Sequence, residues 1–383
     1  MREVLDDVVG WWAVGEPVGL ATVVRTSGST PRQPGAVMAV RSGAVGHAVV
    51  RGSVSGGCVE SAVYELTQQV VATGDPVLQQ YGVEDEDAMA VGLTCGGAIE
   101  VYVERVDQRS FPELGDVAAS VRAGSPVAIA TCVAGPPHRR GRRLTVWPDD
   151  VRGSLGTRRL DDAATEDVRG FLAAGISATL HYGADGERRG DELTLFITSF
   201  TPPPRMLIFG AIDFAAATAR MGAFLGFHVT VCDARGVFAT TERFPGAHEV
   251  VVDWPHRYLR GEIDSGLVDA RTVVCVLTHD PRFDVPVLEI ALRADLGYVG
   301  AMGSRRTHDE RLKRLREVGV TEPDLRRLHS PIGMDIGART PEETAVSIAS
   351  EVIAARWGGT GRHLSDSEGR IHAGILPLQV VHT

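Results

Sequence analysis

The chain has 383 residues, 23% of them charged, and a formal net charge of −10 at pH 7. At about 150 residues per domain, this length predicts two or three domains that fold without disulfides or metals. The acidic balance argues against nucleic acid or an anionic membrane as a partner. An acidic start and the lack of an apolar run of about 18 residues predict a cytoplasmic protein without a signal peptide or membrane helix.

The first half, residues 1–201, predicts an α+β domain with a mixed sheet and flanking helices. Amphipathic or apolar periodicity predicts helices over 4–14 and 58–71. Strand-like runs lie at 18–25, 36–40, 44–50, 99–106, 126–132, 144–147, 176–182 and 193–198. Three prolines follow at 202–204 and cannot lie inside a helix or a central strand, so we place a domain boundary there.

The second half, residues 205–357, alternates strand and helix signals. Apolar runs without in–out alternation at 206–209, 228–232, 249–252, 272–278 and 297–300 predict buried parallel strands. Helices are predicted over 211–225, 283–293, 307–318 and 341–357, the last two opening with capping-box patterns at Thr307 and Thr340. The repeated βα units predict a doubly wound, Rossmann-like parallel sheet, followed by a C-terminal tail at 358–383.

A Gly-rich loop at residues 51–60 joins a predicted strand to a predicted helix. Glycines let the backbone approach a ligand closely, and a helix N-terminus offers unpaired N–H groups, so together they predict an anion cradle. Cys58 would lie in the first helical turn near Arg51, which favours its thiolate form. The alternative is a tight turn with Cys58 as a small buried residue. The candidate ligand-binding residues of this loop are Arg51, Ser53, Ser55, Gly56, Gly57 and Cys58.

A second cysteine has a similar setting, in the run Cys95-Gly96-Gly97 before a predicted strand. Two cysteines beside Gly-Gly pairs predict one shared site, suited to soft-metal ligation, thiol redox chemistry or a sulfur-containing ligand. The total of five cysteines is odd and contains no CxxC pair, so neither a disulfide framework nor a structural zinc site is expected. An iron–sulfur flavoenzyme with two clusters would need about eight cysteines.

The second half offers candidate positions after its strands, where ligands of such sheets bind. Gly210 begins a dinucleotide-type loop, and Asp233 follows at close to the spacing of about 20 residues expected of a ribose-binding acid. Ile212 replaces the second glycine of the fingerprint, and its branched side chain argues against NAD(P) binding. The remaining candidates are His279, Asp280, Ser304, Arg305 and Arg306, for which solvated loop and helix residues are the plainer alternative.

These motifs resemble the signatures of the xanthine dehydrogenase accessory protein family of the XdhC/CoxI type. In the first half the resemblance rests on residues 28–32 (Gly-Ser-Thr-Pro-Arg), 52–60 and 93–100. In the second half it rests on residues 277–281, 300–307 and 331–343. It implies an XdhC/CoxI-like domain over 1–201 and a Rossmann-like domain over 205–357. The chain departs from the family pattern at Ile212.

The resemblance implies a chaperone that binds the molybdenum cofactor, a pterin whose dithiolene holds molybdenum. It implies delivery to xanthine dehydrogenase or a related molybdenum hydroxylase, with Cys58 and Cys95 as contacts to the cofactor and its metal. A cysteine desulfurase is a further candidate partner and a homodimer a candidate assembly. The chain would then be an accessory factor rather than an enzyme. Two alternatives remain open: an NAD(P)-dependent oxidoreductase, and a thiol redox enzyme that uses Cys58 and Cys95.

Overall fold

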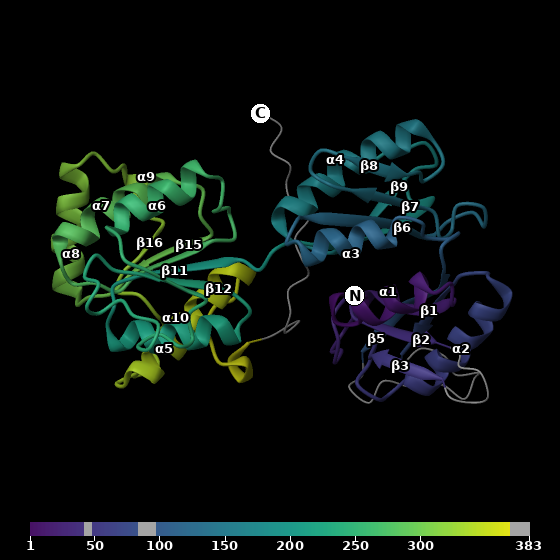
Figure 1. Ribbon diagram of the computed structural model, residues 1–383, viewed down its shortest axis with the longest axis horizontal. Coiled ribbons are helices and arrows are strands. Elements are labelled where there is room, and N and C mark those ends of the chain that lie inside the picture. Colours follow the sequence, from purple (N-terminus) through teal and green to yellow (C-terminus); the bar gives the residue numbers. More distant parts are fainter. Residues whose placement is uncertain (42–47, 83–96, 368–383) are drawn as a thin grey trace. The chain divides into compact units, whose positions relative to one another are not determined.

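The computed structural model describes residues 1–41, 48–82 and 97–367. The chain divides between Pro202 and Pro203 into two compact units (Figure 1). The first unit is built on antiparallel sheets and the second on a parallel sheet. The predicted combination of an α+β first half and a Rossmann-like second half is therefore confirmed.

The first sheet of the first unit has five strands in the order β3-β2-β1-β5-β4. The strands are β1 (Val18–Ser27), β2 (Val37–Arg41), β3 (Val49–Gly52), β4 (Val77–Tyr81) and β5 (Ala98–Val106). Helix α2 (Glu60–Thr73) packs against this sheet. Its buried residues Val63, Thr67 and Val70 recur at helical spacing, which gives the helix one face for the core.

The second sheet of this unit has the order β8-β7-β6-β10-β9. Its strands are β6 (Val127–Ala134), β7 (Arg143–Val146), β8 (Val151–Gly153), β9 (Ala178–Tyr182) and β10 (Leu193–Phe200). Helix α4 (Arg158–Ala174) packs on it through Leu160, Ala164 and Val168. The Thr157 side chain caps this helix by accepting a hydrogen bond from the Leu160 backbone N–H.

One apolar core joins the two sheets of the first unit. The 3-10 helix η1 (Arg2–Val4), α1 (Leu5–Ala13) and α3 (Leu114–Arg122) contribute Val4, Leu5 and Leu114 to it, in that order. Leu20 of the first sheet and Ile129 of the second pack in the same cluster.

The prediction of a mixed sheet in the first unit is wrong, because this unit has two sheets and their described pairs are antiparallel. Among the described residues of the first unit, all strand pairs are antiparallel. Short returns such as β1 to β2 and β6 to β7 lead directly into antiparallel pairs, whereas a parallel pair needs a long crossover. The predicted strand at 44–50 lies partly outside the described residues, and its described end is β3.

The second unit contains a six-stranded parallel sheet in the order β13-β12-β11-β14-β15-β16. The strands are β11 (Arg205–Phe209), β12 (His228–Cys232), β13 (Glu249–Val251), β14 (Val273–Val276), β15 (Tyr298–Ala301) and β16 (Leu328–His329). In chain order this is 3-2-1-4-5-6, the doubly wound arrangement of dinucleotide-binding domains. The order reverses between β11 and β14, where such folds form their ligand crevice.

Helices cover both faces of this sheet (Figure 1). Helices α5 (Asp213–Phe224) and α10 (Pro341–Trp357) pack on one face. Helices α6 (Pro255–Asp264), α7 (Pro281–Arg293), α8 (Arg305–Glu317) and α9 (Glu322–Leu325) pack on the other. A short 3-10 helix, η2 (Leu364–Asp366), lies in the exposed segment after α10.

Two predicted helix starts have different outcomes. Thr340 forms the predicted capping box, with Pro341 in the first turn and Glu343 returning the hydrogen bond. The capping box predicted at Thr307 is wrong, because Ser304 is the N-cap and Arg305 the first helical residue of α8. The Ser304 side chain accepts the Thr307 backbone N–H, so a serine three residues earlier takes the role expected of the threonine.

Candidate functional site

The Gly-rich loop between β3 and α2 is anchored at both ends and open in the middle. Val54 and Val59 are fully buried in the core of the first sheet. Between them, Gly56 (φ +75°) and Gly57 (φ +123°) are exposed and adopt backbone conformations that favour glycine. A Cβ placed on either glycine would meet no atom of the described residues, its chain neighbours aside, within 4 Å. The loop therefore presents bare backbone with open space above it.

The carboxylate of Glu60, the first residue of α2, lies inside this loop and accepts four hydrogen bonds. Its Oε1 accepts from Ser53 Oγ (2.6 Å) and the Ser55 backbone N–H (2.9 Å). Its Oε2 accepts from Ser55 Oγ (2.5 Å) and the Gly57 backbone N–H (2.8 Å). The predicted cradle for an anion exists, but in this structure the chain's own carboxylate occupies it.

Two serines extend this arrangement to the neighbouring amides. Ser53 Oγ accepts from the Gly56 N–H (2.8 Å), and Ser55 Oγ accepts from the Val59 N–H (3.0 Å). Burial alone would raise the pKa of Glu60, but the hydrogen bonds from Ser53, Ser55 and Gly57 outweigh it and lower this pKa to about 2. Glu60 is therefore ionised at neutral pH. Glu60 was not among the residues predicted from the sequence, although an acid at a helix start beside two serines is a recognisable signal.

Cys58 lies two residues before α2, not in its first turn as expected. The helix starts at Glu60, with Val59 as the N-cap residue. The Cys58 side chain is half-buried and packs against the core cluster that contains Val54 and Ile99. The Arg51 guanidinium lies against α1, where its Nε is 3.3 Å from Asp7 Oδ1.

The second cysteine motif is described only from Gly97 onward, because Cys95 and Gly96 lie outside the described residues. A Cβ on Gly97 would lie 2.2 Å from the carbonyl oxygen of Ser29 and 2.8 Å from that of Ser27. Only glycine fits there. The backbone at Gly97 therefore lies directly against the turn that begins the 28–32 motif, and Ser27 pairs with Ala98 across β1 and β5.

In the second unit, Gly210 and Asp233 lie at the carboxyl edge of the sheet. Gly210 (φ +115°) directly follows β11, and a Cβ there would lie 2.9 Å from the Thr278 backbone nitrogen, across the point where the strand order reverses. Asp233 follows β12. Ile212, the N-cap residue of α5, has extended backbone (φ −122°), and its half-buried side chain packs against the core between the sheet and α5.

The Asp233 carboxylate is fully engaged by protein groups. Its Oδ2 accepts from the Ala211 N–H (2.8 Å) and Arg235 Nη2 (2.7 Å), and its Oδ1 accepts from the Arg235 backbone N–H (2.8 Å) and Nε (2.9 Å). Burial would raise the pKa of Asp233, but these hydrogen bonds lower it overall. The Arg235 guanidinium also lies over the Phe238 ring at 4.9 Å. A ribose would compete with Arg235 for this carboxylate.

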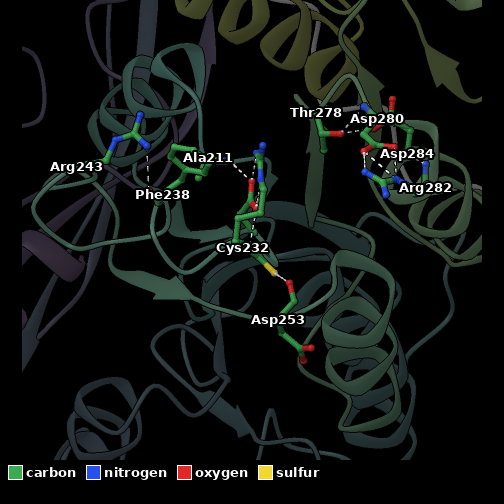
Figure 2. Close-up of polar contacts among 11 residues, drawn as sticks. Ala211, Cys232, Phe238, Arg243, Asp253, Thr278, Asp280, Arg282 and Asp284 are labelled. Atoms are coloured by element: carbon green, nitrogen blue, oxygen red, sulfur yellow. Dashed lines mark hydrogen bonds and ion pairs between the residues drawn. The ribbon is translucent and has the colours of Figure 1, made fainter.

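The remaining predicted residues of the second unit lie at helix starts. Asp280 caps α7 and pairs with Arg282 Nη2 at 2.6 Å, a contact drawn in Figure 2. His279, Ser304 and Arg305 are exposed. Arg306 is exposed and pairs with Glu310 one turn along α8, at 3.2 Å. The structure thus places these side chains after β14 and β15, the strands that the sequence predicted to lead into them.

A buried ion pair beneath these loops was not predicted from the sequence. Asp284 accepts from Thr278 Oγ1 (2.7 Å, Figure 2) and from Arg311 Nη2 (3.0 Å). The same guanidinium donates to the Met302 carbonyl (2.8 Å) and to Ser330 Oγ (2.9 Å). It therefore links the segments that follow β14, β15 and β16. The signal was present in the sequence, because Asp284 lies on the apolar stripe of its own helix.

Within residues 1–41, 48–82 and 97–367, no cluster of three or more His, Cys, Asp or Glu side chains has the geometry to hold a metal ion. The helices of the same ranges include none that is long and apolar enough to cross a membrane.

The fold and the loops define a two-unit α/β protein with a Rossmann-type second unit. Two family models match it: "XdhC Rossmann domain" over residues 206–352, and "XdhC and CoxI family" over residues 11–82 and 120–183. The chain is 30% identical over 350 residues to a probable xanthine dehydrogenase subunit of Bacillus subtilis, a match that covers 89% of this chain and 94% of that protein. The chain belongs to the XdhC and CoxI family, as its motifs predicted.

Two further relatives extend this comparison. "Molybdenum cofactor insertion chaperone PaoD" of Escherichia coli is 26% identical over 342 residues, which cover 89% of this chain and 84% of PaoD. A crystal structure described as a xanthine dehydrogenase from Bacillus halodurans matches with a TM-score of 0.67 at 26% identity, covering 95% of this chain and 97% of that one. The similarity thus spans both units.

Proposed function

We propose that this chain binds the molybdenum cofactor and delivers it to xanthine dehydrogenase or a related molybdenum hydroxylase. The family and the name of the relative PaoD support this function. The observation that carries it is the loop at residues 53–60, where the open backbone of Gly56 and Gly57 leads directly to the Cys58 thiol. An accessory factor of this kind needs an approachable site rather than a set of acid–base groups.

The chemistry of the loop suits the proposed cargo. Thiolates are soft ligands, and the molybdenum of this cofactor is already held by dithiolene sulfur. A glycine pair beside the thiol lets a bulky pterin come close to the backbone. We assign Cys58 as one contact and keep Cys95, which lies outside the described residues, as the second.

The remaining parts of the proposal concern partners and nucleotide. A cysteine desulfurase would supply sulfur to the bound cofactor, and a homodimer would be the working assembly. We propose that the second unit does not bind NAD(P) in the usual pose. The absent second glycine at Ile212 and the engagement of Asp233 by Arg235 support this assignment.

Replacing Cys58 tests the function directly. The wild type, Cys58→Ala and Cys132→Ala are purified from a molybdenum-replete host, and bound molybdenum and pterin are measured with the melting temperature. Cys132 is the matched control because it is buried and burial raises its pKa to about 11, which keeps it a neutral thiol. We expect Cys58→Ala to lose cofactor at least about tenfold, as for lost groups of a metal site.

The control should keep its cofactor even if its melting temperature falls slightly. Full cofactor in Cys58→Ala would overturn the role of this thiol. Equal loss in both variants would show that the effect follows from stability and not from the loop.

A further inference from the structure

We propose that Glu60 is a positioning residue: its carboxylate fills the anion-binding nest of the 53–60 loop and holds Cys58 in place. The cofactor then meets this loop through the Cys58 thiol and not through its phosphate. The identity of the ligand rests on the proposed function. The positioning role rests on the contacts of Glu60 alone.

The first step is that the donors which form the nest are already engaged. Each carboxylate oxygen of Glu60 accepts one serine hydroxyl and one backbone N–H. The N–H groups of Gly56 and Val59 donate to the two serine oxygens. A phosphate in this position would have to displace Glu60 and would then lie beside its negative charge, which opposes binding.

The second step is that both chain neighbours of Cys58 depend on Glu60. The N–H of Gly57 donates to the carboxylate itself, and the N–H of Val59 donates to Ser55 Oγ, which in turn donates to the carboxylate. The backbone on either side of the thiol is therefore held through one carboxylate. Among residues 1–41, 48–82 and 97–367, no atom beyond the chain neighbours lies within 4 Å of a Cβ built on Gly56 or Gly57, so this part of the chain leaves their face open to a ligand.

The third step is that a neutral amide cannot replace this carboxylate. In Glu60→Gln one oxygen becomes an NH2 group, which donates and cannot accept. At least one pair of donors, a hydroxyl and a backbone N–H, then loses its acceptor. The exchange rate of the loop amides should rise at least about tenfold, the loss expected when hydrogen bonds to a charged acceptor are broken.

The experiment compares the wild type, Glu60→Gln, Glu60→Asp and Glu65→Gln. Glu65 is an exposed residue of the same helix and serves as the matched control. Hydrogen exchange of residues 53–60 and the rate of Cys58 alkylation by iodoacetamide are measured by peptide mass spectrometry, with and without inorganic phosphate. We expect both rates to change in Glu60→Gln, to shift less in Glu60→Asp, and to match the wild type in Glu65→Gln.

The phosphate arm tests whether the donors of the nest are already engaged by Glu60, and the Cys58 alkylation rate tests whether Glu60 positions the thiol. Phosphate should leave exchange of the wild-type loop unchanged. Slower exchange with phosphate in the wild type, or unchanged exchange and alkylation in Glu60→Gln, would overturn the proposal. Should Glu60→Gln not fold, Glu60→Asp decides, because its shorter side chain keeps the charge but not the reach.

The cofactor content of the same preparations distinguishes the two proposals. A wild type that carries no cofactor, together with a loosened loop in Glu60→Gln, would refute the proposed function and leave the positioning role intact. A wild type that carries cofactor, together with an unchanged loop in Glu60→Gln, would refute the positioning role and leave the proposed function intact.

Discussion

Replacing Arg311 by methionine removes the positive charge that ties together three segments of the second unit. The Arg311 and Asp284 side chains are only 3% and 5% exposed. The guanidinium also donates to the Met302 carbonyl and the Ser330 hydroxyl. Methionine keeps most of the side-chain volume but leaves the Asp284 carboxylate buried without a counter-charge.

The expected loss of unfolding free energy at pH 7 is about 3–5 kcal/mol, the usual result of removing one partner of a buried ion pair. Burial already raises the pKa of Asp284, although Thr278 and Arg311 partly oppose it. Without Arg311 this pKa rises further. Above this raised pKa, the variant buries a charged Asp284 carboxylate, so its loss of unfolding free energy is largest there. As the pH falls through the raised pKa, Asp284 is protonated in the folded protein and the loss becomes smaller.

Unfolding in urea is monitored by the hydrogen exchange of individual peptides, because the two units need not unfold in one step and each must be measured separately. Arg306→Met is the control, since its side chain is 89% exposed on the same helix and should cost less than about 0.5 kcal/mol. Replacing both partners, by Asp284→Leu with Arg311→Met, should recover most of the loss. A cost below about 1 kcal/mol for Arg311→Met, or a double variant no more stable than the single one, would refute the reasoning.

Three further predictions concern a carboxylate, a glycine and a nucleotide. Because the pKa of Glu60 is lowered to about 2 from 4.5, its contribution is present above pH 4.5 and lost as the pH falls toward 2. The wild type should therefore lose about 1–2 kcal/mol more than Glu60→Gln over this window, after allowance for solvent screening, and parallel acid titrations would contradict this. Gly210→Ala should cost about 1–3 kcal/mol because of its positive φ and the Thr278 nitrogen 2.9 Å from the new Cβ. Gly261→Ala lies in helix α6, where the new Cβ would meet no atom outside its own helical turn within 4 Å in the described part of the chain, and it should be neutral or stabilising in the same thermal melts. Calorimetry with NAD, NADH and NADPH should detect no tight binding, and a tight Kd for any of them would revive the oxidoreductase alternative.

The parallel sheet of the second unit was predictable because its strands are buried on both faces. Met206 and Ile208 of β11 pack into one core, and Leu207 and Phe209 pack into the other. Such strands have continuous apolar runs without in–out alternation, and in a repeated βα pattern these runs indicate buried parallel strands. Helix α6 was missed, because its 10 residues bury only Pro255 and Leu259.

The first unit was harder to predict because its pairings join distant segments. The strand-like runs were recognised, but β1 pairs with the distant strand β5, and in this register Val18 lies opposite Val106, 88 residues along the chain. The division into two sheets depends on such long-range pairs and cannot be found from local periodicity. Helix α4 was missed because charged residues surround its apolar stripe.

The candidate site was predicted as a set of motifs but not as a set of contacts. The glycines of the 53–60 loop predict a backbone conformation that other residues rarely adopt, and Gly56 and Gly57 both have a positive φ. The occupant of that backbone could not be predicted, since it depends on where the Glu60 side chain turns once α2 has started. The helix start itself was misplaced by two residues, which moved Cys58 out of the first turn.

The cofactor content of the wild-type chain tests the central claim most directly. The protein is purified from a molybdenum-replete host, and molybdenum and pterin are measured across the peak that elutes from a size-exclusion column. We expect both to elute with the chain in a constant ratio and to pass to a cofactor-free xanthine dehydrogenase added afterwards. A chain that elutes with neither molybdenum nor pterin would contradict it.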